Sequence, residues 1–211
     1  MRKSNEFGGK ITPLFLNGPI MKDCIADKVL SHWENLRDGR LVPKRSEIDP
    51  RELRNALNYT FILEADAPDN IRFRLAGSKL CDCMGMEMRG MPAYSMIQLG
   101  GRNSFNEAIQ TCLSHPQMLS FRMQPGASMI LLPMADEDDN ISRILGCVTV
   151  DPNHPGFPTR FDVLSMSRTR IIAAKSMIPE PVNGLAEDQQ SFQAQTKRAA
   201  SRKPPFLRIV K

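Results

Sequence analysis

The residues best suited to chemistry are five arginines in the N-terminal half of the chain: Arg37, Arg40, Arg45, Arg72 and Arg74. Arg72 and Arg74 are one pleat apart on a predicted strand, so both side chains point to the same side of it. A guanidinium group presents a fork of donors that matches a carboxylate or a phosphate. The arginines therefore indicate a site for an anion or a nucleotide, or a contact with a partner protein. The alternative is internal pairing with nearby acids, namely Glu47, Asp49 and Asp66.

Methionine is abundant, with 13 residues, and many of them fall in the middle of the chain and on predicted strands. Methionine fills irregular space and adapts to variable ligands. The apolar side chains of these segments indicate either an adaptable ligand pocket or simply the core of the domain. The residues expected to bound this pocket are Phe73, Met84, Ile109, Phe121 and Leu131.

The five cysteines do not have the spacing of a metal site. Zinc sites usually combine two close pairs of ligands, and Cys81 with Cys83 makes one pair. That spacing on a helix would point the two thiols to different sides. Five is also an odd number in a chain long enough to fold without disulfides, which favours reduced thiols in the cytoplasm. We therefore expect no metal and no cofactor, and leave open an unidentified small ligand.

No motif of a common enzyme class is found. The chain lacks a Gly-Lys-Ser/Thr phosphate loop, a Gly-x-Ser-x-Gly elbow and a His-Glu-x-x-His sequence. Its 41% of hydrophobic residues suffices for a folded core. No apolar stretch approaches the roughly 18 residues that a membrane span needs. We expect a cytoplasmic protein without catalytic residues.

Positive charge is concentrated at the C-terminus. The chain carries 28 Lys and Arg against 23 Asp and Glu, a net charge of +5, and residues 189–211 contain six basic residues and no acid. The rest of the chain is thus close to neutral. A solvated tail, a docking peptide, or a contact with nucleic acid or a membrane would each fit this segment. The interleaved aromatic residues of a nucleic-acid platform are missing from it, which disfavours the nucleic-acid interpretation.

A helix is expected from near Asp23 to just before Gly39. Its apolar residues recur at spacings of three and four, which places them on one helical face. They are Met21, Ile25, Val29, Trp33 and Leu36. A lone amphipathic helix must bury this face on its own sheet or on a second copy of the chain. Ile25, Val29 and Trp33 are therefore expected to pack within the chain or across a dimer.

Apolar periodicity and turn signals predict the remaining elements. A short helix is expected after Asp49, which would form a capping box with Glu52, and a second capping box pairs Ser104 with Glu107. The other expected elements are strands at 59–63, 71–75, 118–123, 128–134 and 144–150, helices at 78–84 and 104–115, and a further strand or helix within 161–172.

Two strands, a helical middle and three strands are the layout of a PAS domain, and three segments carry a more specific resemblance. They are Trp33-Glu-Asn-Leu-Arg37-Asp-Gly-Arg40 with Pro43-Lys-Arg45, then Ile48-Asp-Pro50, then Arg72-Phe-Arg74-Leu-Ala-Gly77 with Gly85 and Arg89-Gly90. Together they resemble a PAS-like family of short bacterial single-domain proteins over residues 22–151. Glu64 stands where an aspartate is expected, and the segment after Pro179 has no counterpart.

The resemblance implies an α+β fold, with a PAS-like five-stranded antiparallel sheet, helices on one face and the amphipathic N-terminal helix ahead of it. Such domains sense small ligands or redox state, or mediate protein contacts, and often pair through a helix ahead of the sheet. Along the chain we expect a flexible leader, an N-terminal helical segment, the PAS-like core, a C-terminal extension and a basic disordered tail, at residues 1–19, 20–57, 58–151, 152–178 and 179–211.

The function predicted from these features is that of a non-catalytic sensory or adaptor protein in bacterial signalling. It would bind a small ligand in its core, a signalling partner protein, or both, and would form a homodimer. The alternatives are a pure protein-interaction module with no ligand, and a nucleotide-responsive regulator that uses the arginines. A fold alone does not decide among them.

Overall fold

The computed structural model of the chain describes residues 23–67, 70–151 and 158–173. In this part the α-helices are α1 (Asp23–Arg37), α2 (Ser78–Met84) and α3 (Arg102–Ser114), and the strands are β1 (Thr60–Ala67), β2 (Asn70–Ala76), β3 (Gln117–Gln124), β4 (Ala127–Ala135), β5 (Ile141–Val150) and β6 (Asp162–Arg170). Short 3-10 helices are η1 (Arg45–Glu47), η2 (Leu57–Tyr59), η3 (Ala93–Met96) and η4 (Leu99–Gly101). The predicted leader and basic tail lie outside the described residues.

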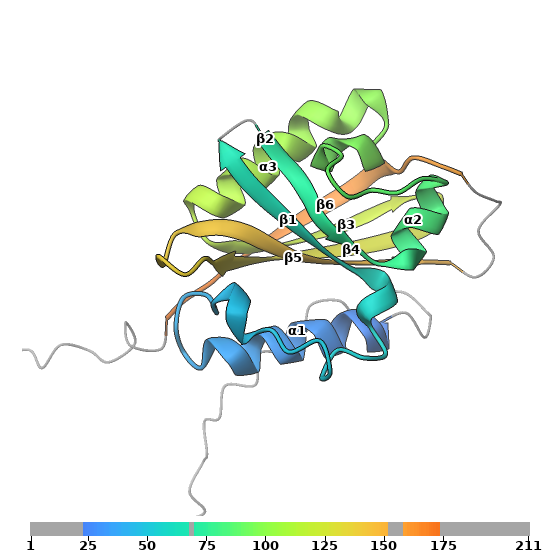
Figure 1. Ribbon diagram of the computed structural model, residues 1–211. Helices are drawn as coiled ribbons and strands as arrows, with labels where there is room; N and C mark the ends of the chain where they lie inside the picture. Colours follow the sequence, from blue (N-terminus) through green and yellow to red (C-terminus); the bar gives the residue numbers. More distant parts are fainter. Residues whose placement is uncertain (1–22, 68–69, 152–157, 174–211) are drawn as a thin grey trace, which may run out of the picture. The chain divides into compact units, whose positions relative to one another are not determined.

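The strands form one antiparallel sheet in the order β2-β1-β5-β4-β3-β6 (Figure 1). The expectation of five strands was wrong, because residues within 161–172 add β6 to the outer side of β3. This strand is anchored at both ends, since Phe161 and Ile171 are buried while most residues between them are exposed. The two flanking apolar residues therefore hold a polar strand against the sheet.

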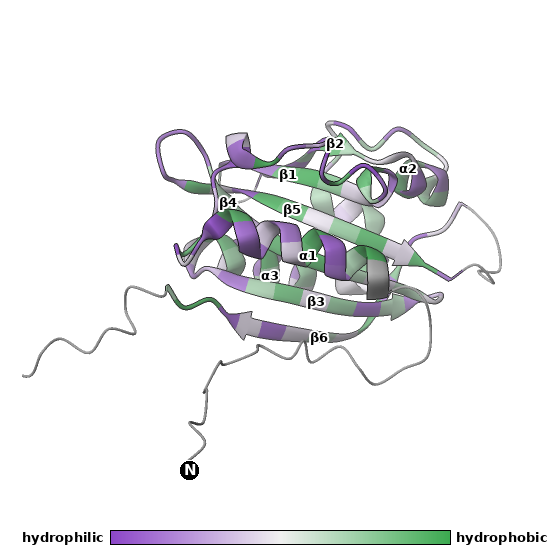
Figure 2. Ribbon diagram, turned by 90° about the horizontal axis from the view of Figure 1, so that it is seen from below, coloured by the Kyte–Doolittle hydropathy of each residue, from purple (hydrophilic) through white to green (hydrophobic). Residues whose placement is uncertain are grey.

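Helices cover both faces of the sheet. Figure 1 shows α2 and α3 on one side and α1 on the other, and Figure 2 shows α1 lying over the sheet and running in much the same direction as β3 and β5. The apolar stripe predicted for α1 is buried within the chain, with Val29 and Trp33 both at 0% exposure and Ile25 half-buried. Their partners on the sheet include Ile130 and Leu145. The structure thus places the stripe on the chain's own β4 and β5.

The helix predicted after Asp49 does not form, and residues 50–56 make turns instead. The Asp49 carboxylate accepts a hydrogen bond from the Arg51 amide at 2.8 Å. A bond to the amide two residues on is typical of an Asx turn, and it replaces the predicted helix cap. The Glu52 carboxylate lies 2.9 Å from Nδ1 of the buried His32 in α1. The Glu52 carboxylate, which the predicted capping box required, is therefore engaged by His32 of α1 instead.

Two smaller differences have local causes. The short helix after Asp49 would have placed Leu53, Ala56 and Leu57 on one inward face, but in the turns only Leu53 and Ala56 are buried and Leu57 is 37% exposed. Helix α3 begins at Arg102, after its N-cap residue Gly101. Ser104, the predicted N-cap, therefore lies inside the helix. The remaining helices and strands were predicted at nearly their observed positions.

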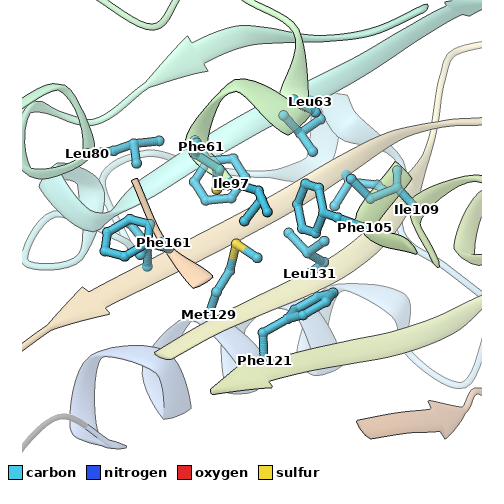
Figure 3. Packing of buried hydrophobic residues seen from close by; sticks show 14 of the residues in the cluster. Phe61, Leu63, Leu80, Ile97, Phe105, Ile109, Phe121, Met129, Leu131 and Phe161 are labelled. Atoms are coloured by element: carbon cyan, nitrogen blue, oxygen red, sulfur yellow. The ribbon is translucent and has the colours of Figure 1, made fainter. Parts of the chain in front are cut away.

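The larger part of the core lies between the sheet and the α2–α3 side (Figure 3). Two edge-to-face aromatic pairs stand at its centre, Phe61 with Phe73 and Phe105 with Phe121, each with ring centroids 5.4 Å apart. Gly146 of β5 lies opposite Phe61, and a Cβ at this glycine would collide with the Phe61 ring. A glycine is needed here so that the aromatic ring can lie against the sheet.

Candidate anion-binding site at the β1–β2 edge

The five predicted arginines do not form one cluster. Arg37 is the last residue of α1 and Arg40 follows it by three residues, Arg45 lies in η1, and Arg72 and Arg74 lie on the edge strand β2. The chain brings together two separate groups, and each must be judged by its own partners.

The α1 group is engaged within the chain. Arg37 Nε contacts the Glu34 carboxylate at 2.7 Å, and its guanidinium lies 5.7 Å from the centre of the Trp33 ring. Arg40 donates from Nη2 to both carboxylate oxygens of Glu47, at 2.9 and 2.8 Å. Burial alone would raise the pKa of Glu47, but hydrogen bonds from Arg40 and the Lys44 amide bring it below its ordinary value. For Arg37 and Arg40, internal pairing is therefore what the structure shows.

The β2 group opens into a pocket of about 170 Å³ beside the edge of the sheet. Strands β1 and β2 supply most of its wall, and the loop after α2 supplies the rest. The lining residues are Glu64, Asp66, Arg72, Phe73, Arg74, Arg89 and Gly90. Three arginines and two acids thus surround a space large enough for a small anion.

Arg72 is held in place by neutral groups. Its Nε donates to the Asn70 side-chain oxygen at 2.7 Å, and its Nη1 donates to the Gly90 carbonyl oxygen at 2.9 Å. Gly90 has a φ of +80°, a conformation that side chains other than glycine rarely adopt. Among the described residues, neither Arg72 nor Arg89 has a carboxylate within ion-pair distance. Arg72 and Arg89 therefore line the pocket without an ion pair among the described residues.

Arg74 stands at a bulge of the β1–β2 ladder. Ile62 pairs with Leu75 and Leu63 pairs with Phe73, so Arg74 has no opposite residue. A bulge re-aims the side chain that it carries. Arg74 Nε lies 3.7 Å from Glu64 Oε2, whereas Arg143 Nη2 of β5 lies only 2.6 Å from Glu64 Oε1. The charge of Glu64 is thus held mainly by Arg143, and an anion in the pocket could still recruit Arg74.

Arg45 follows Lys44, which bridges Ala135 of β4, and the adjacent Met134 pairs with Arg143. Burial, and then the charge of Arg143, lower the pKa of Arg45 below its ordinary value. No ion pair to Arg45 is found within the described ranges. Sequence reasoning missed Arg143 and assigned no role to Glu64 or Arg89. The Arg89-Gly90 pair was noticed only as part of the family resemblance.

The five residues expected to bound a ligand pocket meet in one buried cluster: Phe73, Met84, Ile109, Phe121 and Leu131. Figure 3 shows Ile109, Phe121 and Leu131 pointing into this cluster. Phe73 also lines the charged pocket, so this one residue of β2 belongs to both the pocket wall and the core. These five residues are therefore part of the buried core, packed among its other apolar side chains.

The buried cysteines are poor metal ligands as they stand. Burial raises the pKa of Cys83 to about 11 and of Cys112 and Cys147 to about 12, which keeps the thiols protonated. Within the described ranges no group of three or more His, Cys, Asp and Glu residues is placed to hold a metal ion. Three arginines line the β1–β2 pocket, and a guanidinium fork matches a carboxylate or a phosphate.

A family model for the PAS domain matches residues 21–149, which is more than half of the chain. The chain belongs to the PAS domain family. PAS domains are signalling and sensory modules in general, and they are generally non-catalytic. A comparison with curated proteins found no match. The matched residues of this PAS domain contain the whole charged pocket, while β6 lies beyond them.

None of the helices in the described part of this PAS domain is both long enough and apolar enough to span a membrane.

Proposed function

We propose that this PAS domain is a non-catalytic sensory module that binds a small carboxylate or phosphate compound in the β1–β2 pocket and changes its contact with a signalling partner in response. The observation that carries the proposal is the state of the pocket arginines. Arg72 and Arg89 have no ion pair among the described residues, and Arg74 is 3.7 Å from a carboxylate that Arg143 already holds. A bound anion would satisfy all three guanidinium groups.

A route from the pocket to the core supports a sensory role. The Phe73 amide donates to the Met91 carbonyl oxygen at 2.9 Å, and the Gly90 amide donates to the Phe73 carbonyl oxygen at 2.7 Å. The loop that supplies Arg89 is thus hydrogen-bonded to the strand residue whose ring packs on Phe61. An anion that draws Arg89 toward Arg72 would pull on this loop and on the core beneath it.

The test is a titration of the full chain with inorganic phosphate, with acetate and with a nucleoside triphosphate, followed by calorimetry and thermal unfolding. A probe at 100 times its Kd stabilises the folded state by about 2.7 kcal/mol. We expect the double variant R72A/R89A to lose this stabilisation. The exposed Arg54, which does not line the pocket, supplies the control R54A. The proposal fails if no probe binds, or if R54A weakens binding as much as R72A/R89A.

An apolar ligand in the core is a second candidate, because all five residues predicted to bound such a pocket converge in one cluster with further methionines, including Met88, Met96 and Met129. Methionine side chains can rearrange around a ligand. Native mass spectrometry of the purified full chain tests this candidate. A retained small-molecule mass would support it, and a bare mass would leave the anion pocket or a pure protein-interaction role.

A further inference from the structure

The positive surface of the sheet extends well beyond the pocket. Glu64 of β1 pairs in register with Arg72 of β2 on one side and with Arg143 of β5 on the other. Residues that face each other across antiparallel strands lie on the same face of the sheet. The next cation is Arg45 of η1, which directly follows Lys44; Lys44 bridges Ala135 of β4. The adjacent β4 residue, Met134, pairs with Arg143. Burial, and then the charge of Arg143, lower the pKa of Arg45.

The charges along this row are out of balance. The row contains five arginines in the described part of the chain: Arg45, Arg143, Arg72, Arg74 and Arg89. It contains three acids. Asp66 accepts a hydrogen bond from the Asn70 amide group, and Glu64 is held by Arg143. Asp136 accepts a hydrogen bond from Ser142, which together with the nearby charge of Arg143 lowers its pKa. Arg143 Nε is buried and has no hydrogen-bond partner among the described residues. The excess of guanidinium groups therefore continues on both sides of Glu64.

The size of this row decides between a small anion and a longer ligand. Neighbouring strands are about 4.8 Å apart, so β2 and β5 place their arginines on the order of 10 Å apart. A single carboxylate or phosphate cannot contact Arg89 and Arg45 together. A ligand that engages the whole row needs at least two anionic groups, separated by a segment that can lie over Glu64.

We propose that this row docks an acidic segment of a partner protein, with one acidic side chain in the β1–β2 pocket and another beside Arg143 and Arg45. The proposal rests on the proposed function, because it uses the same pocket. A polypeptide suits the centre of the row, since its backbone N–H groups can donate to the Glu64 carboxylate that would repel a uniformly anionic ligand. The side chains then meet arginines on both sides, which is the charge complementarity that sets partner choice.

The test uses a peptide of alternating glutamate and alanine with blocked ends, and the same peptide with glutamine in place of glutamate. Binding to the full chain is measured by fluorescence anisotropy at increasing salt. We expect the glutamate peptide to bind, the glutamine peptide not to bind, and affinity to fall as salt screens the charges. We expect R45A to weaken the peptide about tenfold, as loss of one charge-assisted contact does.

Two controls separate this proposal from the one it rests on. Phosphate and acetate binding should be unchanged in R45A, because Arg45 does not line the pocket, and R54A should leave peptide binding unchanged. Circular dichroism should be the same for all variants, which checks that a fall in R45A is not a folding defect. If small anions bind but the glutamate peptide binds no tighter and ignores R45A, the docking proposal is wrong and the pocket stands. If neither binds, both proposals are wrong.

Discussion

The indole Nε1 of Trp33 donates a hydrogen bond to the carbonyl oxygen of Pro133 at 2.9 Å, between residues 100 positions apart in the chain. Pro133 pairs with Ile144 of β5, whereas the β3–β4 pairing covers Leu119 to Met123 and does not reach it. A proline has no N–H to donate, so it is tolerated where a strand has no partner on that side. The Pro133 carbonyl oxygen therefore has no partner from β3, and Trp33 of α1 donates a hydrogen bond to it.

The substitution W33F tests this contact. It keeps an aromatic ring but leaves the buried Pro133 carbonyl without its donor, so we expect the free energy of unfolding to fall by about 1–3 kcal/mol. W33A also leaves a cavity and should cost about 3–5 kcal/mol. Urea denaturation gives both values. A W33F variant as stable as the parent chain, beside a large loss in W33A, would show that packing, and not the hydrogen bond, accounts for the role of Trp33.

The substitution E64Q tests the charge balance of the pocket. Glu64 is the carboxylate shared by Arg143 and Arg74, so its removal should raise the affinity for phosphate and acetate while lowering stability by about 1–3 kcal/mol through the unpaired Arg143. Calorimetry and urea denaturation measure the two effects separately. Weaker phosphate binding in E64Q would mean that Glu64 positions the arginines rather than competes for them.

The substitution G146A tests the close approach of β5 to the Phe61 ring. The added methyl group collides with this ring, so we expect a loss of stability of about 1–3 kcal/mol, as for other overpacked cores. Gly100 offers a matched control, since a Cβ there meets nothing within 4 Å. A change of G146A no larger than that of G100A, measured by thermal unfolding, would contradict the observed packing.

The buried cysteines predict a loss of stability at high pH. Burial raises the pKa of Cys83 to about 11 and of Cys112 and Cys147 to about 12, while the unfolded chain ionises its thiols near the ordinary value of about 9. The stabilising effect of the protonated thiols is therefore complete below about pH 9 and is lost as the pH rises toward 12.

Urea midpoints measured on both sides of pH 9 check this prediction. The double variant C112A/C147A should have a flatter profile than the parent chain over the same range. These thiols should also react with a thiol reagent only after denaturation. Rapid reaction of Cys112 or Cys147 in the folded protein would show that this region opens.

Local sequence patterns correctly predicted helices and strands wherever the apolar residues kept one helical or strand period throughout the element. The stripe of Val29 and Trp33 predicted α1, and the alternation of Ile71 and Phe73 with arginines predicted β2. The pattern at Asp49 failed because His32, seventeen positions earlier, takes the Glu52 carboxylate. Which surface the α1 stripe would cover was also beyond local reasoning, since that depends on the whole sheet.

The site was predicted in part. Arg72 and Arg74 were singled out from their type and spacing, and both line the pocket. Arg89 reaches it from the loop after α2, and Arg143 reaches Glu64 only because β5 lies next to β1 in the sheet. The bulge at Arg74 has no marker in the sequence. Contacts set by strand order cannot be found from spacing along the chain.

The attachment of α1 to its own sheet has a consequence for competition. A helix that belongs to the same chain as its binding surface acts at an effective concentration that reaches about millimolar. A helix from another molecule, present at cellular levels, would have to bind β4 and β5 far more tightly than α1 does in order to replace it. Because α1 covers β4 and β5, the exposed arginines Arg72, Arg74 and Arg89 are left for a partner to reach.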